Sequence, residues 1–275
     1  MGVLTATWRT WVKGESVTPA KLNTPITIDI TSSVGNYIYG LELSNNSTDS
    51  DHDIDISAGQ ALDSTNSDVI ILGAFTKQLD GGWTQGTNQG GLDTGSIAAD
   101  TWYHMYAIAK PDGLADAIFS TNATTPSLPA GYTLFRRIGS VLTDSSANIV
   151  QFFQNGDIFH YNTPRLDIDV TAGALFDASD TLPSTPLGIE TIANVSVNGS
   201  VGSGSVAGSQ VVLYPEIYGS VAYWDAGIGN SAGTFGCTKQ LFVNSSQQVR
   251  RKCNFTTGSL TYTVYVNYYI DARGK

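Results

Sequence analysis

The segment 51–55 (Asp-His-Asp-Ile-Asp) carries carboxylates at its first, third and fifth positions, as a calcium-binding loop does. The rest of that pattern is missing, because the sixth position holds Ile56 instead of glycine and the twelfth holds Leu62 instead of glutamate. Ile54 and Ile56 instead alternate with the acidic residues, which is typical of a strand with one apolar face. We therefore expect a strand with an acidic outer face and predict no metal site.

No pattern in the sequence indicates an enzyme. The three histidines, His52, His104 and His160, are too far apart in sequence to form a metal-ligand motif. His104 shares one face of the predicted strand 102–109 with three apolar or aromatic residues, so we expect a packed histidine and not a general base. There is no nucleophile elbow, zinc-protease motif or phosphate-binding loop. Aspartates are frequent enough for a chance glycosidase-like pair, but no spacing points to one, and we predict no cofactor.

Two tryptophans lie in segments rich in glycine and aspartate. Trp83 follows Asp-Gly-Gly, and Trp224 precedes Asp225. An aromatic ring in such a loop can stack on a sugar, but it can equally fix the loop to the surface of its own body. We favour the second interpretation and keep Trp83, Trp224 and Asp225 as candidate ligand-binding residues.

The two cysteines, Cys237 and Cys253, flank a predicted hairpin that turns at residues 244–247. A three-residue loop centred on Ser245 would place them opposite each other, within reach of a disulfide. A two-residue loop would change the register and separate them. Because the N-terminus lacks a secretory signal, we expect a reducing cytoplasm and favour free thiols, with a disulfide formed after cell lysis as the alternative.

Strand signals dominate from residue 28 onward, with 37–43, 102–109 and 115–120 among the predicted strands, and no window of a dozen residues has a helical period. The segment 260–270 is the clearest: its even-numbered residues, among them Tyr262, Val264 and Tyr268, are predicted to share one face. Many short strands joined by turns predict an all-β fold, an antiparallel β-sandwich of jelly-roll type. We assign residues 28–275 to this body. A division at the Gly/Ser-rich run 199–209 is the alternative to a long surface loop there.

Residues 1–27 have a different character. A Thr-Pro pair predicts one short helix in an otherwise extended segment. So short a segment cannot bury its own tryptophans, so it either packs on the body or docks on another chain. The candidate contact residues are Trp8, Trp11, Val12 and Leu22.

Composition narrows the classes of partner. A net charge of −10 and a pI of about 4.5 argue against a nucleic-acid partner, which requires a basic surface. No run of 18 apolar residues is present, so we expect no membrane insertion.

Three parts of the sequence together resemble a known family. The first comprises residues 7–15 (Thr-Trp-Arg-Thr-Trp-Val-Lys-Gly-Glu) and 17–24 (Val-Thr-Pro-Ala-Lys-Leu-Asn-Thr). The second comprises segments between 53 and 157, including 90–96 (Gly-Gly-Leu-Asp-Thr-Gly-Ser) and 131–140 (Gly-Tyr-Thr-Leu-Phe-Arg-Arg-Ile-Gly-Ser). The third is the ending 268–275 (Tyr-Tyr-Ile-Asp-Ala-Arg-Gly-Lys). The chain resembles bacteriophage virion structural proteins of the tail-fibre or minor structural family. Tyr269 stands where that family usually has Trp, and residues 199–236 have no counterpart.

The resemblance implies a non-enzymatic component of the virion, assembled in the host bacterial cytoplasm. Residues 1–27 would attach to other virion proteins, and the β-body would face outward toward a host cell-surface glycan or protein. A homo-oligomer, with a trimer favoured, is implied as well. The alternatives are a capsid decoration or head-fibre protein and, in another class, a glycan-cleaving tailspike-like enzyme. The resemblance carries no individual catalytic or binding residue to this chain.

Overall fold

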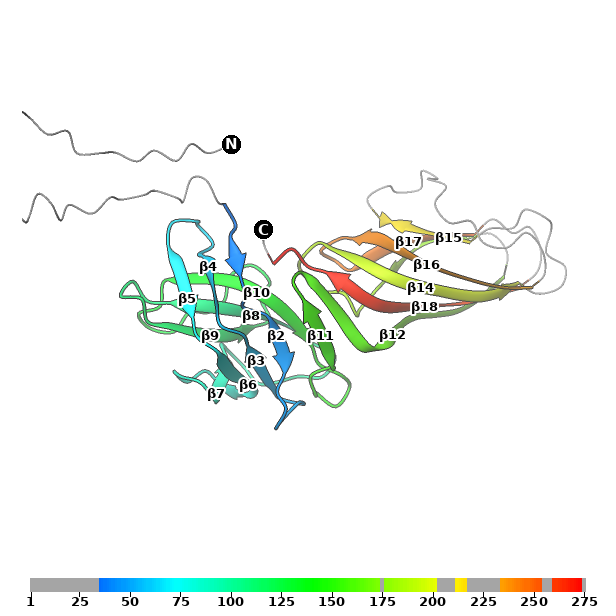
Figure 1. The fold of residues 1–275 in the computed structure, drawn as a ribbon. Helices are drawn as coiled ribbons and strands as arrows, with labels where there is room; N and C mark the ends of the chain where they lie inside the picture. The colour runs from blue at the N-terminus through cyan, green and yellow to red at the C-terminus, as the bar shows by residue number, and fades with distance from the viewer. Residues whose placement is uncertain (1–34, 174–175, 202–210, 217–232, 254–258, 274–275) are drawn as a thin grey trace, which may run out of the picture.

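A computed structural model describes residues 35–173, 176–201, 211–216, 233–253 and 259–273 of the chain (Figure 1). The predicted fold class, an all-β sandwich built mainly of antiparallel strands, is confirmed. The predicted segment 1–27, with its helix and the residues Trp8, Trp11, Val12 and Leu22, lies outside the described residues. Within the described residues, no helix has the length and apolar character needed to span a membrane.

The described residues contain eighteen strands, which form two groups that lie side by side in Figure 1. The N-terminal group contains β1 (Ile38–Tyr39), β2 (Leu43–Asn45), β3 (Asp53–Ile56), β4 (Gly59–Leu62), β5 (Val69–Leu72), β6 (Phe75–Gly82), β7 (Gln89–Leu92), β8 (Trp102–Ala109), β9 (Ala115–Ser120), β10 (Leu134–Leu142) and β11 (Phe152–Asn155). The C-terminal group contains β12 (Ile158–Gly173), β13 (Phe176–Thr181), β14 (Thr191–Val201), β15 (Val211–Pro215), β16 (Gly233–Val243), β17 (Gln248–Cys253) and β18 (Ser259–Ile270).

One twelve-stranded sheet joins the two groups, in the order β10-β8-β9-β7-β6-β3-β2-β11-β12-β18-β14-β16. Its pairs are antiparallel except β6–β7 and β7–β9. The small sheet β1-β4-β5 belongs to the N-terminal group, and the sheet β13-β17-β15 belongs to the C-terminal group. Because β11 pairs with both β2 and β12, the two groups share one continuous hydrogen-bonded ladder.

Local sequence signals place several strands correctly. The predicted strands 102–109 and 115–120 coincide with β8 and β9. The predicted strand 37–43 is instead divided into β1 and β2, because Gly40 and Leu41 both adopt positive φ angles of 64° and 54°. A Cβ atom at Gly40 would lie 2.4 Å from the carbonyl oxygen of Ala58, so this crossing requires glycine.

The last strand follows its predicted alternation only in part. Tyr262, Val264 and Val266 are buried on one face, as predicted, but Tyr269 is buried instead of Tyr268. Register shifts in both neighbouring ladders show that β18 bulges at Asn267. The amide of Asn267 donates to Asn194 Oδ1 at 2.8 Å and Ser196 Oγ at 2.9 Å, which holds the bulge. An extra residue in a strand exchanges the two faces beyond it, so Tyr268 and Ile270 leave the predicted face.

Candidate functional site

Trp83 packs on its own body. Its indole N–H donates to the carbonyl oxygen of Ala117 at 3.2 Å, and its ring meets Tyr132 edge to face with centroids 5.4 Å apart. Lys77 Nζ lies 5.4 Å from the ring centre. The half-buried ring also lines a hollow of about 540 Å³ with Leu128 and Asp93. These contacts match the favoured interpretation, in which the ring fixes its loop.

The other predicted candidates are not brought to this hollow. Trp224 and Asp225 lie outside the described residues. Cys237 is a free thiol, and burial raises the pKa of that thiol. The predicted hairpin between Cys237 and Cys253 is wrong: β16 pairs with β14, whereas β17 pairs with β13 and β15 in another sheet. The geometric argument for a disulfide depended on that hairpin and therefore no longer holds.

The acidic segment 51–55 forms part of a strand, but its acidic face is not wholly outward. Asp53 is buried in β3, and burial raises the pKa of its carboxyl group, with Asp49 and Asp80 adding to the effect. Asp55 is half-buried and accepts hydrogen bonds from its neighbours. Within the described parts of the chain, no three His, Cys, Asp or Glu side chains converge as metal ligands.

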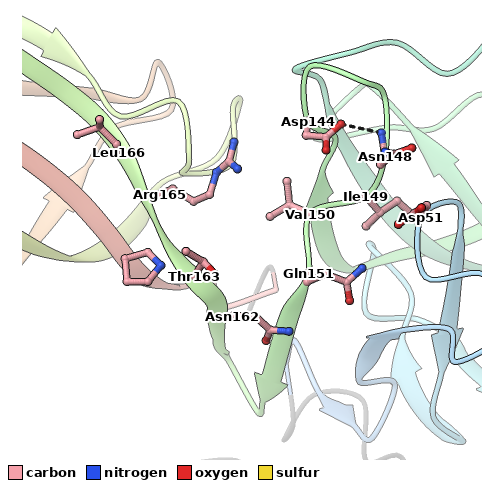
Figure 2. A pocket seen from close by; sticks show the side chains of 11 residues that line it. Asp51, Asp144, Asn148, Ile149, Val150, Gln151, Asn162, Thr163, Arg165 and Leu166 are labelled. Atoms are coloured by element: carbon pink, nitrogen blue, oxygen red, sulfur yellow. Dashed lines mark hydrogen bonds between the residues drawn. The ribbon is translucent and has the colours of Figure 1, made fainter.

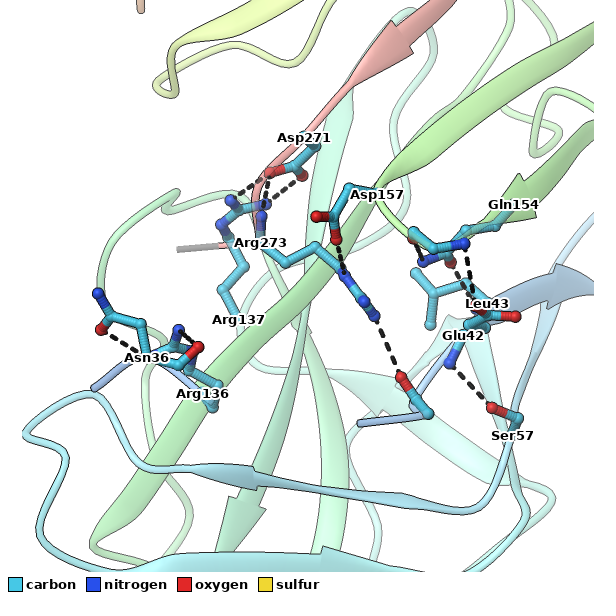
Figure 3. A network of polar contacts seen from close by, with 12 residues as sticks. Asn36, Glu42, Leu43, Ser57, Arg136, Arg137, Gln154, Asp157, Asp271 and Arg273 are labelled. Atoms are coloured by element: carbon cyan, nitrogen blue, oxygen red, sulfur yellow. Dashed lines mark hydrogen bonds and ion pairs between the residues drawn. The ribbon is translucent and has the colours of Figure 1, made fainter. Parts of the chain in front are cut away.

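His104 is a buried, packed histidine, as expected. Its Nδ1 lies 2.9 Å from Ser140 Oγ, and burial lowers the pKa of the imidazole to about 4, with the charge of Arg137 acting in the same direction. Arg137 also forms a two-pronged ion pair with Asp271, at 2.5 and 2.7 Å (Figure 3). Burial alone would lower the pKa of Arg137, but Asp271 raises it above its ordinary value. His104 and Ser140 are each 1% exposed, so this centre is a packed structural contact.

A second ion pair completes a contact that we call the clasp, formed by Arg137, Asp157, Asp271 and Arg273. Arg273 Nε lies 3.1 Å from Asp157 Oδ1, and its guanidinium donates to the carbonyl oxygen of Gly40 at 3.1 Å (Figure 3). The clasp fixes the residues after β18 to the N-terminal group. Nearby, Trp102 donates to the carbonyl oxygen of Pro183 at 2.8 Å and packs edge to face on Tyr269.

A cleft of about 500 Å³ lies between β12 and the loop that precedes β11 (Figure 2). Figure 2 shows Arg165 and Leu166 on one wall, and Asp144 and Val150 on the other. Among the residues that the structure describes, none that lines this cleft is aromatic. It therefore offers hydrogen bonds and charge but no stacking surface.

The outer face of the long sheet carries one continuous row of side chains, which we call the outer row. Each member is the direct cross-strand partner of the next: Thr76, Asp55, Ser44, Phe153, His160, Tyr268, Asn194 and Gln240. The Phe153 side chain is 60% exposed. The ring centroids of Phe153 and His160 are 6.5 Å apart, and those of His160 and Tyr268 are 4.7 Å apart. Three rings therefore stand next to one another on the surface.

The residue beside each of these rings points the other way, into the core. Phe159 and Tyr269 stack with centroids 5.0 Å apart and planes within 4°, and Phe152 lies 6.0 Å from Phe159. Successive residues of a strand point to opposite faces, so one pair of aromatic residues supplies an inner and an outer ring. The inner rings fix the backbone that carries the outer row.

A hollow of about 510 Å³ adjoins Phe153, on the side of the outer row where Ser44, Asp55 and Thr76 lie. Its polar lining includes Glu42, Ser44, Asp55 and Thr76. Asp55 Oδ1 accepts hydrogen bonds from Asn46 Nδ2 at 2.8 Å and from Thr76 Oγ1 at 2.6 Å. Glu42 Oε1 accepts from the backbone N–H of Gly156 at 2.9 Å. An exposed ring therefore stands beside two carboxylates whose positions are held by hydrogen bonds.

Sequence reasoning missed both the clasp and the outer row. The adjacent aromatic pairs, Phe152-Phe153 and Tyr268-Tyr269, were a visible signal for a ring on each face. Which outward rings become neighbours depends on how β11, β12 and β18 pair, and no local pattern gives that register.

Comparisons with known proteins add little. No protein-family model matches the chain, and no curated protein matches it. A solved structure of infectious bursal disease virus, Gx strain, matches over 86% of this chain and 76% of that chain, with 11% sequence identity and a TM-score of 0.17. A TM-score this low carries no argument about fold or function.

Proposed function

We propose that the chain is a structural protein of a bacteriophage virion, of the tail-fibre or receptor-binding type. The outer row is the observation that carries the binding part of this proposal. Its exposed ring, Phe153, projects from an interior strand of the long sheet and not from a loop. The backbone that carries the ring is already ordered, so little conformational entropy is lost when a ligand binds. Binding surfaces held on regular elements are positioned more accurately than those on loops.

The virion part of the proposal rests on the resemblance of residues 7–24, the segments between 53 and 157, and the ending 268–275. In the third of these, Asp271 and Arg273 are buried, and they form ion pairs with Arg137 and Asp157 respectively. Residues 1–27 would attach the protein to the particle, in a homo-oligomer for which a trimer is favoured. The same outward face would serve a capsid decoration or head-fibre protein without contact to a receptor.

Adsorption competition tests the proposal. Purified full-length protein is added to host cells before the phage that encodes it, and free phage are counted over time. We expect slower adsorption, because the added protein occupies the receptor. Unchanged adsorption with folded protein would refute receptor binding and favour decoration or assembly.

A second experiment examines residues 1–27. A phage whose chain lacks them should form particles without this protein, while the shortened protein keeps the far-ultraviolet circular dichroism of a β-sandwich. Incorporation of the shortened protein into particles would overturn the attachment role.

The glycan-cleaving alternative has one structural observation in its favour, namely that Glu42 and Asp55 line the same hollow as Phe153. It predicts that host glycan becomes shorter on incubation with the protein, and that Glu42→Gln or Asp55→Asn stops the shortening. Host glycan that is bound but keeps its length supports the non-enzymatic proposal.

A further inference from the structure

We infer that the outer row is a binding site for an uncharged oligosaccharide, lying across the strands from the hollow at Phe153 toward Tyr268. This inference rests on the proposed function, because it names the ligand class of the same face. Three independent properties of the row lead to it: its spacing, its mixture of rings and hydrogen-bonding groups, and its charge.

The spacing fits a chain of sugar rings. Direct cross-strand partners are separated by the distance between strands, about 4.8 Å. That distance is close to the length of one hexose unit, so consecutive sugars of an extended oligosaccharide can meet consecutive members of the row. Phe153, His160 and Tyr268 occupy three successive positions, with ring centroids 6.5 and 4.7 Å apart.

The rings are flanked by side chains that exchange hydrogen bonds with hydroxyl groups. The phenol oxygen of Tyr268 accepts a hydrogen bond from Gln240 Nε2 at 2.9 Å. This bond orients the phenol O–H to donate a hydrogen bond to a ligand. On the other side of Phe153, Ser44 is exposed and Asp55 is fixed by Thr76. A sugar has an apolar face and a polar edge, and this alternation of ring and polar group matches both.

Apolar side chains lie beside the row on the same face. Ile158, Ile270 and Ile192 are cross-strand neighbours on β12, β18 and β14, two residues from His160, Tyr268 and Asn194, and Ile192 is 40% exposed. A protein partner would also find apolar surface there. The spacing and charge of the row carry the choice of a saccharide, and the binding experiment distinguishes the two kinds of partner.

Charge selects the kind of saccharide. The outer row contains no lysine or arginine, and the adjoining hollow presents the carboxylates Glu42 and Asp55. The whole chain carries a net charge of −10. A sialylated or phosphorylated glycan would be repelled, whereas hydroxyl groups can donate to these carboxylates.

The test uses labelled full-length protein on a panel of immobilised oligosaccharides. The panel holds neutral hexose and N-acetylhexosamine chains of two to six units, and the same chains carrying sialate or phosphate. We expect binding to neutral chains that strengthens with length and is lost on the acidic ones. Phe153→Ala should weaken binding about tenfold, which corresponds to the loss of one stacked ring, and Phe153→Trp should retain it.

Tyr39→Ala is the matched control. Tyr39 is a 68% exposed aromatic residue on β1, in the separate sheet β1-β4-β5, and it belongs neither to the outer row nor to the lining of the hollow, so its removal should leave binding unchanged. Failure of every neutral chain to bind, a preference for acidic chains, or equal binding by wild type and a folded Phe153→Ala variant would each overturn the inference. A change in molar mass of the Phe153→Ala variant in sedimentation, without saccharide binding, would identify the face as a contact between copies.

The two proposals fail in different ways. If the protein slows phage adsorption but binds no saccharide, the receptor-binding proposal stands and the saccharide inference falls. If it binds neutral saccharides through Phe153 but leaves adsorption unchanged, the saccharide site stands and the receptor role falls.

Discussion

Replacing Asp271 by alanine removes the central acceptor of the clasp. The carboxylate is 1% exposed and its partner Arg137 is 10% exposed. It accepts two hydrogen bonds from Arg137 and one from the backbone N–H of Arg273 at 2.8 Å. Asp271→Ala therefore leaves a buried guanidinium without its counter-charge. Losing one partner of a buried ion pair lowers the free energy of unfolding by about 3–5 kcal/mol, so the thermal unfolding midpoint Tm should fall by roughly 10 °C.

Urea unfolding followed by tryptophan fluorescence measures this loss, because Trp102 lies beside Tyr269 at the same junction. Asp169→Ala is the control, since Asp169 is an exposed aspartate on β12 whose removal should change stability by less than about 0.5 kcal/mol. Combining Asp271→Leu with Arg137→Met removes both charges and should recover most of the loss. If Asp271→Ala and Asp169→Ala shift the midpoint equally, the assigned role of the clasp is wrong.

Two further predictions concern other buried charges. Lys77 and Asp116 are 2.9 Å apart and essentially unexposed, so Lys77→Met should cost about 3 kcal/mol in urea unfolding, and a cost under about 1 kcal/mol would contradict this. Burial raises the pKa of Asp167 to about 6, so the folded state holds a proton that the unfolded state releases, and stability falls as pH rises from about 4 to 6. His104 has the opposite effect on stability, because its pKa is lowered in the folded state. The stabilisation that comes from its neutral buried form is lost as pH falls from 6.5 to about 4. The two effects nearly cancel in the wild type. Asp167→Asn should therefore add about 2–3 kcal/mol to the free energy of unfolding in urea at pH 7.5, and that free energy should then fall as the pH is lowered to 4.5. A pH profile identical to that of the wild type would refute the assignment.

Local chemistry was enough to predict most strands. The boundaries of β8 and β9 follow from turn residues next to them in sequence, and the apolar alternation of Tyr262–Val266 fixes which face of β18 is buried. The prediction failed at Asn267, because the bulge depends on hydrogen bonds to Asn194 and Ser196 on another strand. A pattern within one strand cannot record that partner.

The failed hairpin at residues 244–247 has a related cause. The turn exists, and the backbone N–H of Gln247 donates to the carbonyl oxygen of Asn244 at 2.9 Å. The strands on either side, β16 and β17, nevertheless enter different sheets, because β16 pairs along its whole length with β14 and β17 pairs on both sides, with β13 and β15. Sequence signals identify a turn but do not decide between pairing across it and crossing from one layer of a sandwich to the other.

The candidate site was harder to predict than the fold for the same reason. The rings of the outer row come from β11, β12 and β18, and their neighbours come from β2 and β14. Each outward position is predictable alone, but their alignment is the product of several ladders. The Trp83 loop, by contrast, was visible as one local motif, and its contacts fix it to its own body.

The separation of Arg137 and Asp271 by 134 positions has a consequence for biosynthesis. Translation delivers the arginine long before its partner, so during synthesis the guanidinium remains in water and the part of β10 around Arg137 cannot adopt its final packing. The contacts of the N-terminal group with Asp271 and Arg273 therefore form only after residues 271–273 have left the ribosome, although its own strands are complete by residue 155. A chain that stops before residue 271 leaves Arg137 without the carboxylate of Asp271. Emergence of residues 271–273 thus becomes a condition for closing the contact around Arg137.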